Sequence, residues 1–406
     1  MLIITPPILK SGESETRIEC TIAIDGNEEV LYYSTPIEWG KYLTFERADA
    51  FLLGVLQYAM KEGHDIEVKA PVSERLYFNL VNQVIPLLSA GFGHKRIKLI
   101  CHQLDSSVLM ADTENPFAVG TGCSLGVDSF GSILYHLQPD TPPSFRLTHL
   151  TYFNVGALGN DTEKATVSYE HDLPMIQEYA AYKQMPLVQL SSNIGQLYTG
   201  WNFDICHLTR NIGAVMALQK LFQRYVYASS HPTSDLQLSD KATGYFETAL
   251  APYLSTENTD VIIGQPSFSR VEKTRYIAQY SETFSRLYVC WREVLKNDYN
   301  GQWVNLNSTK INCSTCYKCK RTMLAIDILG KKDCYSGVFD WASYDRQRDA
   351  LIGFVLANKD RKGRELLKEL CELMVEENFV VPKRAKWYWH EYKLLYKLGL
   401  QKFIRF

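Results

Sequence analysis

Short apolar runs alternate with stretches of helical apolar spacing through the middle of the chain. The runs have the length of strands from residue 116 onward, and between them apolar residues return every three or four positions. This alternation predicts a doubly wound α/β fold, in which helices cover a parallel sheet and ligands bind at the carboxyl ends of its strands. The predicted strands span 117–119, 147–155, 187–190 and 225–229, and the predicted helices span 129–136, 173–181 and 211–222.

Patterns on either side of this region predict two further domains. Residues 1–112 alternate like strands over 17–24, 29–33 and 96–101, with helical spacing over 44–60 and over 74–85, where Pro86 is expected to end the helix. No cluster suited to catalysis lies there, so this α/β domain either presents a partner or substrate or stabilises the fold. Beyond Asp340 the pattern is helical. The predicted domains are 1–112, 113–335 and 336–406.

The composition is that of an ordinary globular protein. Of 406 residues, 46% are hydrophobic and 22% are charged, which excludes long disorder, collagen and coiled coil. The net charge of −2 gives no general attraction for nucleic acid or anionic membranes. No apolar stretch approaches the ~20 residues of a membrane helix, and two prolines interrupt the first ten residues. We therefore expect a cytoplasmic protein with no membrane partner.

Four of the ten cysteines have the spacing of a metal site. In a reducing compartment, a disulfide framework is not expected. Cys313, Cys316 and Cys319 are separated by two residues each, and Cys290 is available as a fourth ligand. Four thiolates predict a closed, structural zinc site, with redox or iron–sulfur chemistry as the alternatives. The other six are expected to be small buried hydrophobes: Cys20, Cys101, Cys123, Cys206, Cys334 and Cys371.

A second candidate site is the glycine- and serine-rich loop of residues 120–129. It lies between a predicted strand and a predicted helix, where backbone N–H groups and the helix dipole favour a phosphate. It lacks the lysine of a Walker A loop and the G-x-G-x-x-G spacing of a dinucleotide site. The alternative interpretation is an ordinary strand-to-helix turn.

This loop resembles the signature S-G-G-x-D-S of the PP-loop ATP pyrophosphatases. The chain keeps Ser124, Gly126, Asp128 and Ser129, and it has Leu125 where that family has its first glycine. A side chain there would crowd the pyrophosphate or disfavour a positive φ. Either the loop accepts β geometry at Leu125, or catalysis is weakened.

Further motifs resemble the 7-cyano-7-deazaguanine synthase (QueC) family within that group. They are the sequence Cys290-Trp291-Arg292 followed by the three-cysteine cluster, Thr209-Arg210-Asn211 at the expected start of a helix, and Lys273-Thr274 within 266–275. The resemblance covers residues 116–325. It leaves out the N-terminal domain and the basic, aromatic C-terminus.

The resemblance implies an ATP-dependent ligase that releases AMP and pyrophosphate. The substrate carboxylate, of the 7-carboxy-7-deazaguanine type, becomes an acyl adenylate that an amine then attacks. The implied cofactors are ATP and Mg²⁺ beside the Zn²⁺, with Asp128 holding the magnesium. The implied cofactor-binding residues are Ser124, Gly126, Val127, Asp128, Ser129 and Asn154, and the implied catalytic residues are Asp128, Arg210 and Lys273.

Several of these side chains have simpler explanations. Arg210 and Lys273 are candidates for countering charge at the phosphates, or they are a surface arginine and a solvated lysine. Asn154 hydrogen-bonds the edge of the adenine base, or it is an ordinary turn residue. His207 assists amine deprotonation or is a satisfied, partly buried histidine.

Acceptor and partners remain open at this stage. The amine is ammonia or, as in relatives from antiviral defence operons, a protein docked by residues 1–112; a homodimer is also allowed. The alternative functions are amidation or sulfur transfer on another carboxylate, and a non-catalytic nucleotide-binding scaffold, which Leu125 allows. The C-terminus suits single-stranded nucleic acid, an acidic protein or, as the expected case, a helix with core aromatics. Its basic and aromatic residues are Lys383, Arg384, Lys386, Trp387, Tyr388, Trp389, Tyr392, Lys393, Tyr396, Lys397, Lys402 and Arg405.

Overall fold

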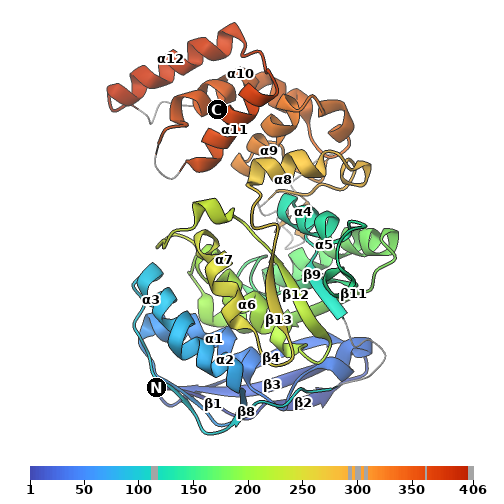
Figure 1. Cartoon of the computed structure of the whole chain (residues 1–406), viewed down its shortest axis with the longest axis vertical. Helices are drawn as coiled ribbons and strands as arrows, with labels where there is room; N and C mark the ends of the chain where they lie inside the picture. The colour runs from blue at the N-terminus through green and yellow to red at the C-terminus, as the bar shows by residue number, and fades with distance from the viewer. Residues whose placement is uncertain (111–117, 291–294, 298–302, 306–309, 362–363, 401–406) are drawn as a thin grey trace. The chain divides into compact units, whose positions relative to one another are not determined.

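The chain folds into two compact units in a computed structural model (Figure 1). The structure describes residues 1–110, 118–290, 295–297, 303–305, 310–361 and 364–400. Unit 1 comprises residues 1–123 and 132–266, and unit 2 comprises residues 124–131 and 267–406. The bounds of these two compact units differ from those of the three predicted domains. The predicted domains therefore stay a prediction.

Unit 1 is built on one large mixed sheet that is mostly parallel. Its order is β13-β12-β9-β10-β11-β4-β3-β1-β5-β7, and β2 pairs with β3 at the side. The first five strands are all parallel, and the chain visits them so that the order reverses between β9 and β12, as in a doubly wound fold. The α/β prediction is confirmed. These strands are β9 (Ala118–Gly122), β10 (His149–Asn154), β11 (Leu187–Ser192), β12 (Phe222–Ala228) and β13 (Asp260–Gly264).

The helices between these strands begin earlier than predicted. Helix α4 spans Val127–His136 and α5 spans Thr162–Tyr182. Helix α6 spans Phe203–Ala217 and not 211–222, because the Asn202 side chain accepts a hydrogen bond from Asp204 N and so caps an earlier first turn. A short α7 (Glu247–Leu250) precedes β13. Pro116 and Phe117, where the first strand was expected to begin, lie outside the described residues.

Residues 1–112 do not form a body of their own. Strand β4 (Asn27–Pro36) pairs with β3 (Glu15–Ile24) on one side, and on the other it pairs with β11. Helix α1 (Asp49–Glu62) packs on α6, where a Cβ on Gly213 would lie 3.0 Å from Ala50 O. Unit 1 thus contains both this segment and the later parallel strands, and the predicted domain boundaries stay a prediction. The remaining strands are β1 (Leu2–Ile4), β2 (Ile8–Ser11), β5 (Ile66–Val68) and β7 (Leu99–Cys101), with the pair β6 (Val72–Ser73) and β8 (Leu104–Asp105) apart from the sheet.

The helical segment after residue 74 continues past Pro86, contrary to prediction. Helix α2 (Glu74–Asn79) passes through a π-helical turn, Leu80–Val84, into α3 (Ile85–Phe92). Pro86 directly follows the π-helical turn, in which Ile85 N bonds Leu80 O, and this wider turn lets the helix continue past a residue that has no backbone N–H. Figure 1 shows α1, α2 and α3 on the same side of β1 and β3.

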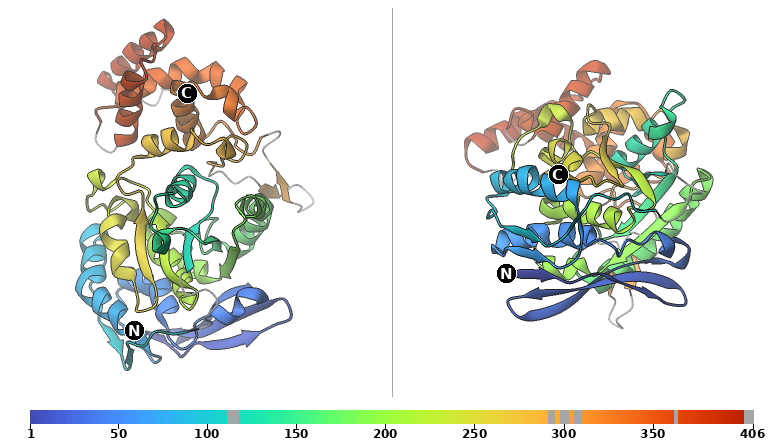
Figure 2. Two further views of the ribbon diagram at one scale, coloured as in Figure 1. Left: turned by 45° about the vertical axis from the view of Figure 1, so that its right-hand side comes forward. Right: turned by 60° about the horizontal axis from the view of Figure 1, so that its bottom comes forward.

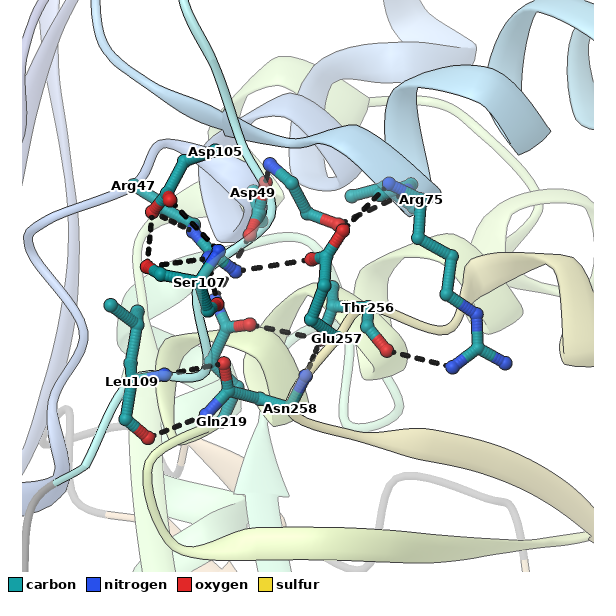
Figure 3. A network of polar contacts seen from close by, with 12 residues as sticks. Arg47, Asp49, Arg75, Asp105, Ser107, Leu109, Gln219, Thr256, Glu257 and Asn258 are labelled. Carbon is teal, nitrogen blue, oxygen red and sulfur yellow. Dashed lines mark hydrogen bonds and ion pairs between the residues drawn. The ribbon is translucent and has the colours of Figure 1, made fainter.

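A buried polar network joins the N-terminal segment to the later strands of unit 1 (Figure 3). The Arg47 side chain is fully buried, and it donates to Asp105 at 2.8 Å and to Glu257 at 3.3 Å. Asn258 bonds both backbone groups of Leu109, at 3.0 and 2.7 Å. Losing residues 1–112 would remove the partners of Glu257 and Asn258, two partly buried polar groups of unit 1.

Unit 2 is mainly helical. Its last three helices pack together (Figure 2), and a Cβ on Gly353 of α10 would lie 2.9 Å from Ala385 O of α12. Asp340, the expected start of the helical region, caps α10 by accepting from Ser343 N. The predicted helical C-terminus is confirmed. The elements are α8 (Arg270–Ile277), β14 (Leu295–Asn297), β15 (Trp303–Asn305), α9 (Tyr317–Ile328), α10 (Trp341–Asn358), α11 (Glu365–Glu376) and α12 (Lys383–Lys397).

The aromatic residues of α12 divide between its two faces. Tyr392 is 3% exposed and Tyr388 and Trp389 are half-buried, as expected of a packed helix. Trp387, in contrast, is 60% exposed. Lys402 and Arg405 lie outside the described residues. Within the ranges that the structure describes, no helix has both the length and the apolar character needed to cross a membrane.

His149, at the start of β10, is a buried titratable group with simple surroundings. Its ring lies 5.9 Å from the Trp39 ring and 6.1 Å from the Phe222 ring, and its Nδ1 lies 2.8 Å from Thr148 Oγ1. Burial lowers the pKa of His149 to about 4. The folded protein therefore holds this imidazole neutral where the unfolded chain would protonate it.

We expect His149→Phe to lose less stability in acid than the unaltered protein. As the pH falls, the unfolded chain takes up this proton near 6.5 but the folded protein takes it up only near 4. The neutral His149 side chain therefore lowers the free energy of unfolding by about 3 kcal/mol as the pH falls from 6.5 to 4. Urea unfolding at pH 7 and pH 4.5 measures the difference.

Two comparisons make this result specific. Burial raises the pKa of Asp49 to about 6, so Asp49 acts with the opposite sign between about 4 and 6, but it does so equally in both proteins. His390, which is exposed, provides the control variant His390→Phe. An acid loss of the same size in His149→Phe and in the unaltered protein would contradict the assignment.

Candidate metal centre and anion-binding loop

The four predicted cysteine ligands converge in unit 2. The Sγ atoms of Cys290, Cys313, Cys316 and Cys319 all lie within 4.8 Å of one another. The Sγ of Cys319 is 3.4 Å from that of Cys316 and 3.8 Å from that of Cys313. Tetrahedral zinc with Zn–S bonds of about 2.3 Å separates its sulfurs by about 3.8 Å. The cluster therefore has the ligands and the spacing to bind a metal such as zinc.

Backbone N–H groups support the cluster as they do in a zinc knuckle. Cys316 N donates to the Sγ of Cys313 at 3.3 Å, and Cys319 N donates to the Sγ of Cys316 at 3.4 Å. Hydrogen bonds from neighbouring thiols, Cys290 foremost, lower the pKa of Cys316 below its usual range. Both effects stabilise thiolate, which is the form that binds a metal.

The turn of the knuckle depends on Ser314. Its φ is +57°, a left-handed conformation that few residues other than glycine adopt, and its side chain is buried. Its Oγ accepts from Asp340 N at 2.8 Å and donates to Asn312 O at 3.3 Å. These bonds fix the turn and connect the cysteine segment to the first residue before α10.

Asn312 joins the Cys290 segment to the knuckle, and sequence reasoning missed it. Its Oδ1 accepts from the N–H groups of Val289 at 2.8 Å and Cys290 at 3.1 Å. Its Nδ2 donates to Leu287 O at 2.7 Å and to Val338 O at 3.1 Å. All four hydrogen-bonding positions of this buried amide are thus used. The only available signal was its place next to Cys313, which does not distinguish it from other asparagines.

We expect Asn312→Leu to weaken zinc binding by about 10- to 100-fold, because Cys290 loses the group that holds its backbone in place. The four backbone groups left without a partner also destabilise unit 2 by several kcal/mol. Competition with a metal chelator measures the affinity. Asn358→Leu is the matched control, since Asn358 is equally buried but makes one intrahelical bond, to Phe354 O. Equal zinc affinities in the two variants would exclude this role.

The glycine- and serine-rich loop closes on itself ahead of α4. Ser124 N donates to Ser129 Oγ at 3.1 Å, and Gly126 N lies 3.4 Å from Ser124 Oγ. Helix α4 begins at Val127, and Leu125 O accepts from Tyr288 N at 2.8 Å. The loop is therefore compact, and the positive end of the α4 dipole lies next to it.

Leu125 has a left-handed backbone conformation, which glycine adopts more readily than leucine. Its φ is +56°, so β geometry, one of the two expected alternatives, is wrong. The left-handed conformation costs a leucine about 1–2 kcal/mol. Its side chain is 1% exposed, and burial of a leucine contributes about 1.5–3 kcal/mol, which offsets this strain.

Asp128 meets two cations of α8. Arg270 Nη2 lies 2.5 Å from Asp128 Oδ2, and Lys273 Nζ lies 3.7 Å from Asp128 Oδ1. Oδ1 is itself buried and has no hydrogen-bond partner among the described residues. Lys273 is 1% exposed, so the interpretation of a solvated lysine is wrong. The Lys273-Thr274 segment does lie beside the predicted loop.

Two arginines of this cluster were not predicted. Arg270 opens α8, and Arg321 lies in α9, just after the last cysteine. Burial, together with the positive charge of Arg270, lowers the pKa of Arg321 to about 10. Asp128 thus pairs with two cations, Arg270 and Lys273, and it also interacts electrostatically with Arg321. A sequence signal existed, because Ser269 and Glu272 form the capping box that places Arg270 in the first turn of α8.

The other predicted site residues belong to unit 1. Arg210 lies in the middle of α6 and is fully buried. It is therefore neither at the start of a helix nor on the surface, contrary to both expectations. His207 is buried with its Nδ1 2.5 Å from Tyr227 Oη, and burial lowers its pKa to about 4, as expected of a satisfied histidine. Asn154 is the buried last residue of β10 and not part of a turn. Trp291 and Arg292 lie outside the described residues.

Comparison with known proteins identifies no relative. No family model, no curated protein and no solved structure matches this chain. The functional interpretation therefore depends on the residues described above and on the resemblance of their motifs.

Proposed function

We propose that the protein is an ATP-dependent carboxylate-activating enzyme of the PP-loop type, similar to the QueC family. The observation that carries this proposal is the group of three cations, Arg270, Lys273 and Arg321, around Asp128 in the loop. Positive charge beside the start of a helix suits a polyphosphate.

The loop and the cations have separate tasks in this proposal. Ser124, Gly126 and Ser129 would hold the departing pyrophosphate through backbone N–H groups and hydroxyls. Arg270 and Lys273 would counter the charge that develops as the bond to the α-phosphate breaks. Positioned charges of this kind act in the transition state without reorganising, which makes them effective in catalysis.

Asp128 would hold the magnesium ion that accompanies ATP. Its Oδ1 is buried and lacks a hydrogen bond, which is the state of an acceptor suited to a cation. Magnesium would neutralise phosphate charge and orient the pyrophosphate for departure. The four-cysteine site would bind Zn²⁺ in a structural role, since it presents four thiolates and no open position.

The substrate class in this proposal is a deazaguanine carboxylate such as 7-carboxy-7-deazaguanine. The acceptor is ammonia or the amine of a protein docked by residues 1–112. Deleting that segment is not a valid test of docking, because Arg47 and β4 join it to the rest of unit 1. Substitutions on its exposed surface, such as Phe78→Ser at a side chain 63% exposed, test docking without removing a strand.

Product analysis tests the reaction type. The purified protein, given ATP, Mg²⁺, ammonium and 7-carboxy-7-deazaguanine, is expected to form AMP and pyrophosphate, and to form far less without the carboxylate. Chromatography of the nucleotides distinguishes AMP from ADP. ADP as the product would contradict the proposal. ATP binding with no cleavage would favour a nucleotide-binding scaffold, the alternative that the leucine at position 125 supports.

A further inference from the structure

Arg210 of unit 1 is a buried cation without a counter-charge. Its side chain is fully buried, and among the described residues no carboxylate forms an ion pair with it. Its Nη1 donates to Asn160 Oδ1 at 2.7 Å, and its Cζ lies 4.7 Å from the centre of the Tyr198 ring and 5.5 Å from that of Phe203. The aromatic rings offset part of the cost of burying this charge, but they do not neutralise it.

One edge of the guanidinium is unused. Nε and Nη2 are buried, and neither has a hydrogen-bond partner in the part of the chain that the structure describes. The nearby Cys206 thiol does not supply a negative charge, because burial raises its pKa. The Nε–H and Nη2–H bonds are nearly parallel and lie on the same edge of the planar guanidinium. They can therefore donate to two oxygens of one anion.

Two glycine backbones pack close to the guanidinium. Gly156 has a φ of +124°, and a Cβ there would lie 2.2 Å from Nη2, 2.3 Å from Cζ and 2.6 Å from Nη1. A Cβ on Gly195 would lie 3.0 Å from Asn160 O and 3.3 Å from Nη2. A larger residue at either position would therefore displace the guanidinium or the segment of Asn160. Gly159, with a φ of +117°, ends the short turn between Gly156 and Asn160.

We propose that the unused edge of Arg210 binds the carboxylate of the small-molecule substrate, which makes Arg210 a substrate-positioning residue. A carboxylate has two oxygens to accept from the two donors. Its single negative charge neutralises the single positive charge of Arg210. A phosphate would bring further oxygens beside the Tyr198 and Phe203 rings, and among the described residues no other side chain that contacts Arg210 has a buried donor without a partner. This inference rests on the proposed function for the identity of the substrate.

The complete burial of Arg210 implies how the ligand enters. The turn of residues 156–160 has to move away for the carboxylate to reach Nε and Nη2. Gly156 and Gly159 both have positive φ values, and glycine crosses between conformations more readily than other residues. Asn160 would keep its bond to Nη1 once the turn has closed again.

Calorimetric titration in the absence of ATP tests the site. The full-length protein is expected to bind 7-carboxy-7-deazaguanine more tightly than 7-deazaguanine, which lacks the carboxylate. Arg210→Gln should weaken binding of the carboxylate ligand on the order of 100-fold, and Arg210→Lys by less, because lysine keeps the charge but not the fork. The binding of 7-deazaguanine should change little in either variant.

Two further variants serve as controls. Arg224 also stacks on an aromatic ring and donates to a backbone carbonyl, so Arg224→Gln should leave binding unchanged. Gly195→Ala keeps the cation and narrows the space beside Nη2. It is expected to weaken binding of the carboxylate ligand but not of 7-deazaguanine, and it tests the site even if Arg210→Gln fails to fold.

The outcomes separate this inference from the proposed function. Equal affinity of the unaltered protein for the two deazaguanines, or no binding, overturns the carboxylate site; AMP formation then still tests the proposed function independently. Weaker ATP binding in Arg210→Gln, with binding of the carboxylate ligand unchanged, would assign Arg210 to a phosphate and also overturn the inference.

Discussion

Replacing Cys316 with serine is expected to release zinc and unfold unit 2. Cys316 Sγ lies 3.4 Å from Cys319 Sγ, and it accepts a hydrogen bond from Cys319 N at 3.4 Å. Cys316 therefore lies at the centre of the knuckle. Binding free energy at a structural zinc site is folding free energy, on the order of 10 kcal/mol. Metal analysis of the unaltered protein should find about one zinc ion per chain. In Cys316→Ser we expect little zinc and a low yield of soluble protein.

Cys334→Ser is the matched control for this change. Cys334 also lies in unit 2, but it does not belong to the four-cysteine cluster. It should keep both the zinc and the yield. Freshly purified protein without zinc would contradict the assignment, as would the visible absorbance of an iron–sulfur cluster.

Replacing Asp128 with asparagine is expected to lower the rate of AMP formation by about 100- to 10,000-fold while leaving the fold intact. Asparagine has the same shape but no charge, so it holds neither Arg270 nor a magnesium ion. The change also removes a counter-charge from Lys273, which is 1% exposed, so we expect a lower unfolding midpoint with the fold retained. Initial rates at saturating ATP, beside a thermal unfolding curve, separate loss of activity from loss of fold.

The control removes an acidic partner of similar type elsewhere in unit 2. Asp345 pairs with Lys332 at 2.5 Å and is 50% exposed. Asp345→Asn should therefore retain the full rate. If Asp128→Asn formed AMP as fast as the unaltered protein, the loop would not be the site of ATP cleavage.

The sequence pattern located the parallel part of the sheet well. Strands β9 to β12 overlap the predicted runs, because each strand contains buried apolar residues close together in sequence. The cysteine spacing also predicted a cluster that the structure brings within bonding range of one ion. In both cases the decisive residues are close in sequence, so a local pattern contains the information.

Contacts between distant segments were not predictable in the same way. The pairing of β4 with β11 joins residues far apart in sequence, and neither strand carries a mark of its partner. Arg270 and Arg321 approach Asp128 only after folding. The early start of α6 followed from one capping bond at Asn202, which a pattern of apolar residues does not register.

The pairing of β4 with β11 has a consequence for the behaviour of the chain in crowded solution. A smaller protein ending its sheet at β11 would present a six-residue edge with unpaired backbone groups, a template for pairing between molecules. Here the antiparallel strands continue the sheet outward, and its far edge is β7, which has three residues. The N-terminal segment thereby shortens this edge of the sheet and protects the parallel strands from pairing with another copy.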